Sequence, residues 1–101
     1  MDYHIMDYKT VIKRMESYMS KFEGDYPDWY VGVTKDLEEG LFDLHGVEEN
    51  GIWISFGADT EEVAKKVEQY FFAKKTDGNP SPLEENARIV YAYKKNSKTT
   101  P

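Results

Sequence analysis

Residues 29–45 read WYVGVTKDLEEGLFDLH, and the hydrophobic pattern changes in the middle of this stretch. Over 29–34 the side chains alternate between two faces, one of which holds a tryptophan and two valines, and this alternation predicts a strand. Asp36 can then cap a helix, and leucines at spacings of four and three predict that helix over 37–44. The chain thus contains a strand that passes directly into a helix.

The other elements follow from the same periodicities. Asp59, three residues before Glu62, predicts a capping box at the start of a helix. Turn-forming residues dominate 76–82 and predict a loop. The remaining predictions are helices over 7–22 and 60–75 and strands over 52–56 and 89–93.

These elements predict an α/β (α+β) fold, in which a small three-stranded sheet is packed with three helices in the order α-β-α-β-α-β. The chain has 101 residues, which is the length of one domain. We assign that domain to 1–94. Because 95–101 contains no apolar residue, we expect it to form a disordered tail.

Composition restricts the classes of function. The chain has no cysteine, which excludes disulfides and thiolate metal sites and favours the cytoplasm. No apolar run approaches the ~20 residues that span a membrane, so we expect no membrane partner. The net charge of −6 argues against strong binding to nucleic acid, although paired lysines leave room for a local basic face. Solvated helix faces explain those lysines more simply.

The Tyr30-Val31-Gly32 segment, followed by a helix that ends near His45, resembles the second half-motif of the GIY-YIG endonucleases. Glu68 occupies the place where that family carries its metal-binding glutamate. The resemblance covers 30–75. Because each motif is short, the resemblance depends on the order and spacing of the motifs together. It implies metal-dependent phosphodiester hydrolysis, with Mg²⁺ or Mn²⁺ on Glu68 and with catalytic roles for Tyr30, Tyr91, His45 and Lys35.

Two departures from the family pattern have consequences. Gly40 stands where the family has its catalytic arginine, which implies weak or no cleavage. Since a glycine in a helix costs about 1 kcal/mol relative to alanine, we expect Gly40→Arg to gain stability. The first half-motif is also absent upstream of Tyr30. We therefore expect 89–93 to supply the missing strand and to pair antiparallel with 29–34.

A simpler explanation exists for each site residue. Tyr30 can be a packed aromatic, Glu68 a solvated partner of neighbouring lysines, and His45 a group that stabilises a helix end. On this view the chain is a non-enzymatic module that binds another protein. The two hypotheses differ in geometry. A nuclease-derived site requires Tyr30, Tyr91 and an accessible Glu68 on one open concave surface, whereas an interaction module leaves them scattered or buried.

Overall fold

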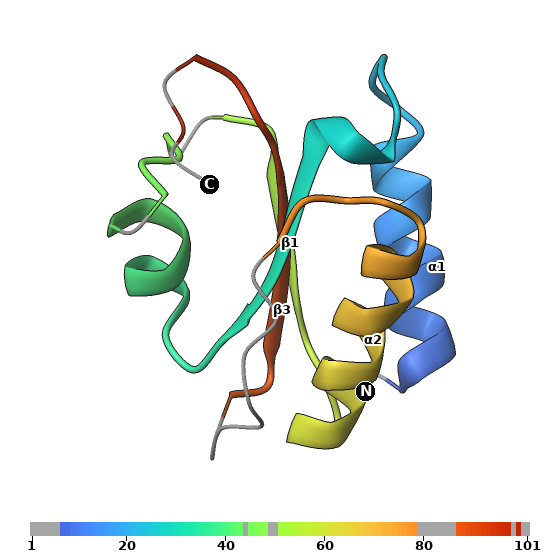
Figure 1. Ribbon diagram of the computed structural model, residues 1–101. Coiled ribbons are helices and arrows are strands. Elements are labelled where there is room, and N and C mark those ends of the chain that lie inside the picture. The colour runs from blue at the N-terminus through green and yellow to red at the C-terminus, as the bar shows by residue number, and fades with distance from the viewer. Residues whose placement is uncertain (1–6, 44, 49–50, 79–86, 98, 100–101) are drawn as a thin grey trace.

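The computed structural model describes residues 7–43, 45–48, 51–78, 87–97 and 99 (Figure 1). It confirms an α+β domain with a three-stranded antiparallel sheet and three longer helices. Within the described residues, no helix has the length and apolar character needed to cross a membrane. In chain order the elements are α1 (Tyr8–Met19), the 3₁₀ turn η1 (Tyr26–Asp28), β1 (Trp29–Thr34), the π-helix η2 (Glu38–Asp43), β2 (Trp53–Gly57), α2 (Glu61–Ala73) and β3 (Ile89–Lys94).

The last strand of the sequence is the central strand of the sheet. The strand order is β1-β3-β2, and β3 is antiparallel to both neighbours. On one side Tyr30 lies opposite Tyr93 and Gly32 lies opposite Tyr91. The expected pairing of 89–93 with 29–34 is therefore confirmed. β3 also pairs with β2 along its other edge.

The two faces of the sheet carry different layers. Figure 1 shows α1 and α2 together on one side of the strands and η2 on the other. The helix-side core is aliphatic and aromatic and contains Val31, Val90 and Ala92 from the sheet. The other face is covered by a smaller cluster that contains Tyr30, Tyr91 and Tyr93. The strand period of two separates these sets, because neighbouring residues point to opposite faces.

Both α-helices begin at a capped residue. In α1 the Asp7 carboxylate accepts from the amide of Thr10 at 2.9 Å. In α2 the cap is Thr60, whose hydroxyl accepts from the amide of Val63 at 3.1 Å. The predicted cap at Asp59 is therefore wrong by one residue. Both residue types are good caps, and the helix begins at Glu61, one residue after the predicted start.

The segment after β1 is a π-helix rather than the expected α-helix. Gly40 is buried in it, and a Cβ atom built at this position would lie 2.8 Å from both Cβ and Oγ1 of Thr34. Thr34 cannot easily give way, because its hydroxyl donates to the carbonyl and accepts from the amide of Asp36. Close contact between η2 and β1 thus explains the glycine. The prediction that Gly40→Arg would gain stability is at odds with this packing.

Candidate functional site

Three tyrosines and one histidine form a ring cluster on the η2 side of the sheet. We use "ring cluster" for Tyr30, Tyr91, Tyr93 and His45. Tyr30 stacks on Tyr93 with ring centroids 5.3 Å apart, and its centroid is 4.4 Å from that of His45. These residues come from β1, from β3 and from the segment that follows η2, so only the folded chain brings them together.

Gly32 makes room for Tyr91. These two residues face each other across β1 and β3, and a Cβ atom on Gly32 would lie 2.5 Å from the Tyr91 hydroxyl oxygen. The ring of Tyr91 therefore lies across the strand over the glycine. This aromatic-on-glycine packing stabilises a strand that lacks a side chain at that point. The glycine of the Tyr-Val-Gly segment thus has a direct structural role.

His45 and Tyr91 share a hydrogen bond, with 3.1 Å between Nε2 of the histidine and the phenol oxygen. His45 is only 8% exposed and Tyr91 only 4%. Burial raises the pKa of the Tyr91 hydroxyl well above its usual value, and the neighbouring Tyr30 raises that pKa further. The hydroxyl therefore stays protonated near neutral pH. It can donate or orient a hydrogen bond, but it is a poor general base.

Glu68 is buried in α2 with an exposed fraction of 2%, which contradicts the expectation that it is solvent-accessible. Its Oε1 lies 3.7 Å from Nζ of Lys65 and has no hydrogen-bond partner among the residues that the structure describes. Burial raises the pKa of Glu68, and Lys65 offsets this only partly. The side chain points into the protein because it lies on the same stripe of α2 as Ala64 and Phe71.

Glu68 is an electrostatic neighbour of two residues of the ring cluster, Tyr30 and Tyr91. The pKa of Tyr30 is raised by burial, then by the charge of Asp77, and then by the charge of Glu68. The charge of Glu68 also contributes to the raised pKa of Tyr91. The charge of Glu68 is the smallest of these influences on the pKa of each tyrosine, after burial and other neighbouring groups.

Asp77 is a site residue that the sequence analysis missed. It follows α2 and forms an isolated parallel β-bridge with Tyr30 in β1. Its carbonyl oxygen accepts from the amide of Val31 at 3.0 Å, and its amide donates to the carbonyl oxygen of Trp29 at 2.8 Å. Its carboxylate contacts Nζ of Lys95 at 3.1 Å. Lys95 was predicted to begin the disordered tail, and its amide also donates to the carbonyl of Asp28. The sequence around Asp77 gives no signal of a site residue, because its neighbours are ordinary turn-forming residues.

The other predicted site residues are placed as follows. Lys35 is exposed in the turn between β1 and η2. Gly40 lies on η2 against Thr34, so no basic side chain occupies the position of the family's arginine. Within the described parts of the chain, no group of three or more acidic, histidine or cysteine side chains is arranged to hold a metal ion. Any ion at this site would therefore depend on Glu68 together with hydroxyl groups or water.

Glu68 leads to a stability prediction. Because its pKa in the folded state is raised above the ordinary 4.5, the folded state binds this proton more tightly than the unfolded state. The contribution of Glu68 to stability is therefore lost as pH rises through the raised value. Glu68→Gln should increase the free energy of unfolding by about 1 kcal/mol at pH 7 and by almost nothing at pH 4.

Urea unfolding at the two pH values measures this effect. Glu62→Gln is the matched control, because Glu62 is an exposed glutamate on the same helix, and it should change little at either pH. A Glu68→Gln protein that is less stable than the wild type at pH 7 would show that the ionised carboxylate is stabilised by its surroundings.

In comparisons with models of known protein families, with curated proteins and with solved structures, the chain gives no match. The geometry alone therefore bears on the two functional hypotheses. Tyr30 and Tyr91 converge, as the nuclease-derived site requires, but both are buried, as is Glu68. Burial of all three residues is the arrangement expected of the interaction module, whereas the meeting of Tyr30 and Tyr91 is the arrangement expected of the nuclease-derived site.

Proposed function

We propose that this chain is a GIY-YIG-like domain that keeps the tyrosines, histidine and glutamate of a phosphodiester-cleaving site but cuts weakly or not at all. One observation carries the proposal. Tyr30, Tyr91 and His45 come from three separate segments and meet in the ring cluster, where His45 also hydrogen-bonds to the Tyr91 hydroxyl. Glu68 acts on the same tyrosines from the opposite layer.

Each residue has a defined part in this proposal. The hydroxyls of Tyr30 and Tyr91 orient a water molecule or a phosphate oxygen, and His45 holds the Tyr91 hydroxyl in place. Glu68 would hold Mg²⁺ or Mn²⁺, which when bound neutralises charge on a phosphate. The Glu68 oxygen that has no hydrogen-bond partner in the described part of the chain would be the ligand for such an ion. Lys35 is the cationic residue nearest in sequence to Gly40, the position where the family has its catalytic arginine.

The missing arginine limits the chemistry. Removing one charge-stabilising donor from a transition state costs on the order of 10²–10³ in rate. Lysine cannot replace the two parallel hydrogen bonds of a guanidinium group. The net charge of −6 also weakens attraction to nucleic acid. We therefore propose weak nucleic-acid binding at most, and a cytoplasmic location.

The second candidate function is a non-enzymatic module that binds another protein. The burial of Tyr30, Tyr91 and Glu68 favours it, because a large substrate needs access to the groups that act on it. In this case the ring cluster serves only to stabilise the fold.

A Mn²⁺ titration followed by NMR separates the two functions. If Glu68 holds the ion, paramagnetic broadening should appear first at Glu68, Tyr30, Tyr91 and His45. Glu68→Gln should abolish that broadening and Glu62→Gln should preserve it. Broadening confined to exposed carboxylates would contradict the metal site. In parallel, purified protein with Mg²⁺ should show no measurable cleavage of DNA or RNA, and clear Glu68-dependent cleavage would refute the loss of activity.

A further inference from the structure

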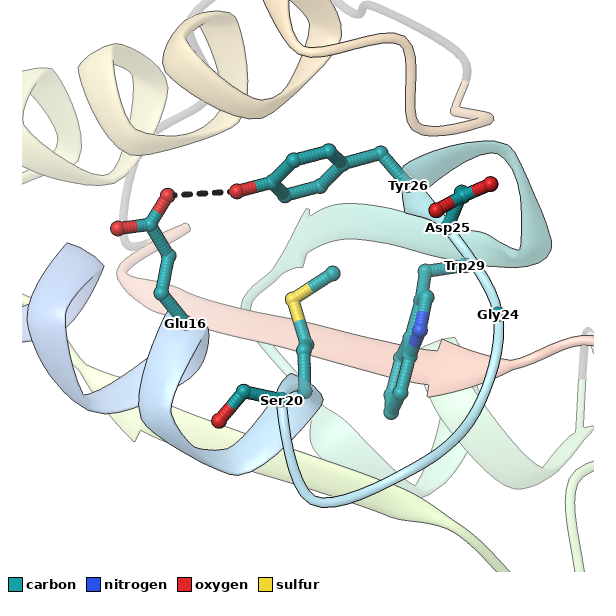
Figure 2. A pocket seen from close by; sticks show the side chains of 7 residues that line it. Glu16, Ser20, Gly24, Asp25, Tyr26 and Trp29 are labelled. Atoms are coloured by element: carbon teal, nitrogen blue, oxygen red, sulfur yellow. Dashed lines mark hydrogen bonds between the residues drawn. The ribbon is translucent and has the colours of Figure 1, made fainter.

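A pocket with a volume of about 150 Å³ opens on the helix side of the sheet, away from the ring cluster. It lies between the last turn of α1, the loop that follows α1, and η1 (Figure 2). Trp29 and Tyr30 are neighbours in β1 and point to opposite faces, so the pocket and the ring cluster are separate sites. The lining residues are Glu16, Met19, Ser20, Gly24, Asp25, Tyr26 and Trp29.

The walls of the pocket are aromatic and held in place. Figure 2 shows the indole of Trp29 at one side of the pocket and the ring of Tyr26 across the top. Tyr18 and Phe22 pack against Trp29 with ring centroids 6.1 and 6.0 Å away. Such contacts leave the indole little freedom. The pocket is therefore pre-organised, which lowers the entropic cost of binding.

Glu16 closes one end of the pocket with an oriented carboxylate. Its Oε2 accepts hydrogen bonds from the hydroxyls of Tyr26, at 2.9 Å, and Tyr70, at 2.8 Å. The hydrogen bond to Glu16 raises the pKa of Tyr70 to about 12, and burial followed by Glu16 raises the pKa of Tyr26. Both hydroxyls stay protonated near neutral pH, so both keep donating. The carboxylate is thereby held in one position.

Both charged residues that line the pocket are acidic. Glu16 and Asp25 lie on opposite sides of it, and no lysine, arginine or histidine is among its lining residues. Aromatic faces attract cations through their quadrupole. Because Trp29 is only 2% exposed, the accessible groups that favour an organic cation are the two carboxylates and the phenol ring of Tyr26. An anion or a phosphate would be repelled.

We propose that this pocket binds the guanidinium group of an arginine side chain that a basic partner protein presents. A planar guanidinium can stack on an aromatic ring while it faces a carboxylate, whereas an ammonium group is more strongly hydrated and loses more on burial. A cavity of this volume accepts one such group and not a folded segment. The acidic total charge of the chain would attract a basic partner.

The test is a ¹H–¹⁵N NMR titration of the full chain with N-acetyl-arginine amide, a blocked form that resembles arginine within a protein. We expect a Kd on the order of 1 mM, the usual range for one small group. Shift changes should concentrate at the lining residues Ser20, Gly24, Asp25, Tyr26 and the Trp29 indole. N-acetyl-citrulline amide, which has nearly the same shape without the charge, should bind at least tenfold more weakly.

Variants and related ligands sharpen the test. Glu16→Gln should weaken binding at least fivefold. Glu23→Gln, which removes an acidic side chain from the same loop outside the pocket, should not weaken it. Ser20→Arg should block binding without removing Glu16. Equal binding of the citrulline amide, tighter binding of free L-arginine or of N-acetyl-lysine amide, or shifts away from the pocket would each overturn the proposal. Because the ring cluster is not involved, the result is independent of the metal titration.

Discussion

Truncation of the chain after Ala87, which removes residues 88–101, is expected to abolish folding. The deleted segment contains β3, which is the only strand that pairs with both β1 and β2 in the described sheet. It also supplies Val90 to the helix-side core and Tyr91 to the ring cluster. Without it the remaining strands lose their common partner, and both layers lose part of their core. Circular dichroism should show little residual structure, and the NMR amide signals should collapse to the narrow range of an unfolded chain.

The control is a shorter truncation that removes residues 96–101 and keeps Lys95. It leaves β3 intact, together with the bonds from Lys95 to Asp28 and Asp77, so it should cost little stability. A chain ending at Ala87 that unfolds cooperatively and shows dispersed NMR signals would contradict the central role of β3.

Gly40→Arg is expected to lower the free energy of unfolding by about 3 kcal/mol or more, since it overpacks a buried contact and also places a charge there. The new Cβ atom would overlap Thr34 at 2.8 Å. This result would reverse the gain predicted from helix propensity alone. The substitution should not create nuclease activity, because the arginine cannot be accommodated while η2 keeps its packing on β1. Urea unfolding and a nuclease assay with Mg²⁺ measure the two effects.

Three further variants test whether the contact with Thr34 is the cause. Glu39→Arg adds the same side chain at the neighbouring exposed position and should be nearly neutral. Gly40→Ala should cost about 1–3 kcal/mol, the usual range for overpacking. The cost of Gly40→Ala should shrink in a Thr34→Gly background, where the clashing atoms are absent. A stable Gly40→Arg protein with detectable cleavage activity would instead show that the site of the resemblance can be restored.

Part of the candidate site could be predicted from the sequence. The alternation in 29–34 and the β-rich run at 89–93 predicted two strands, and the resemblance required that they pair. Their pairing is confirmed, and it brings Tyr30 and Tyr91 to the same face. Tyr93 and Asp77 were missed as site residues. Asp77 lies beside β1 because the backbone of a turn segment pairs with that strand. Backbone pairing does not require a pattern of hydrophobic side chains, so the sequence gives no signal of this contact.

The sequence by itself determined the α+β class, the positions of the strands and α-helices, and the separation of the sheet residues into two faces. These properties depend on neighbours within a few residues, because side chains repeat every two residues in a strand and every 3.6 in a helix. Only the tertiary structure decided that Glu68 is buried, that Gly40 packs on Thr34 in a π-helix, and that Trp29 lines a pocket with Glu16. Each of these depends on which segment, distant in sequence, packs against the residue. The hydrophobic periodicity around the residue does not specify that segment.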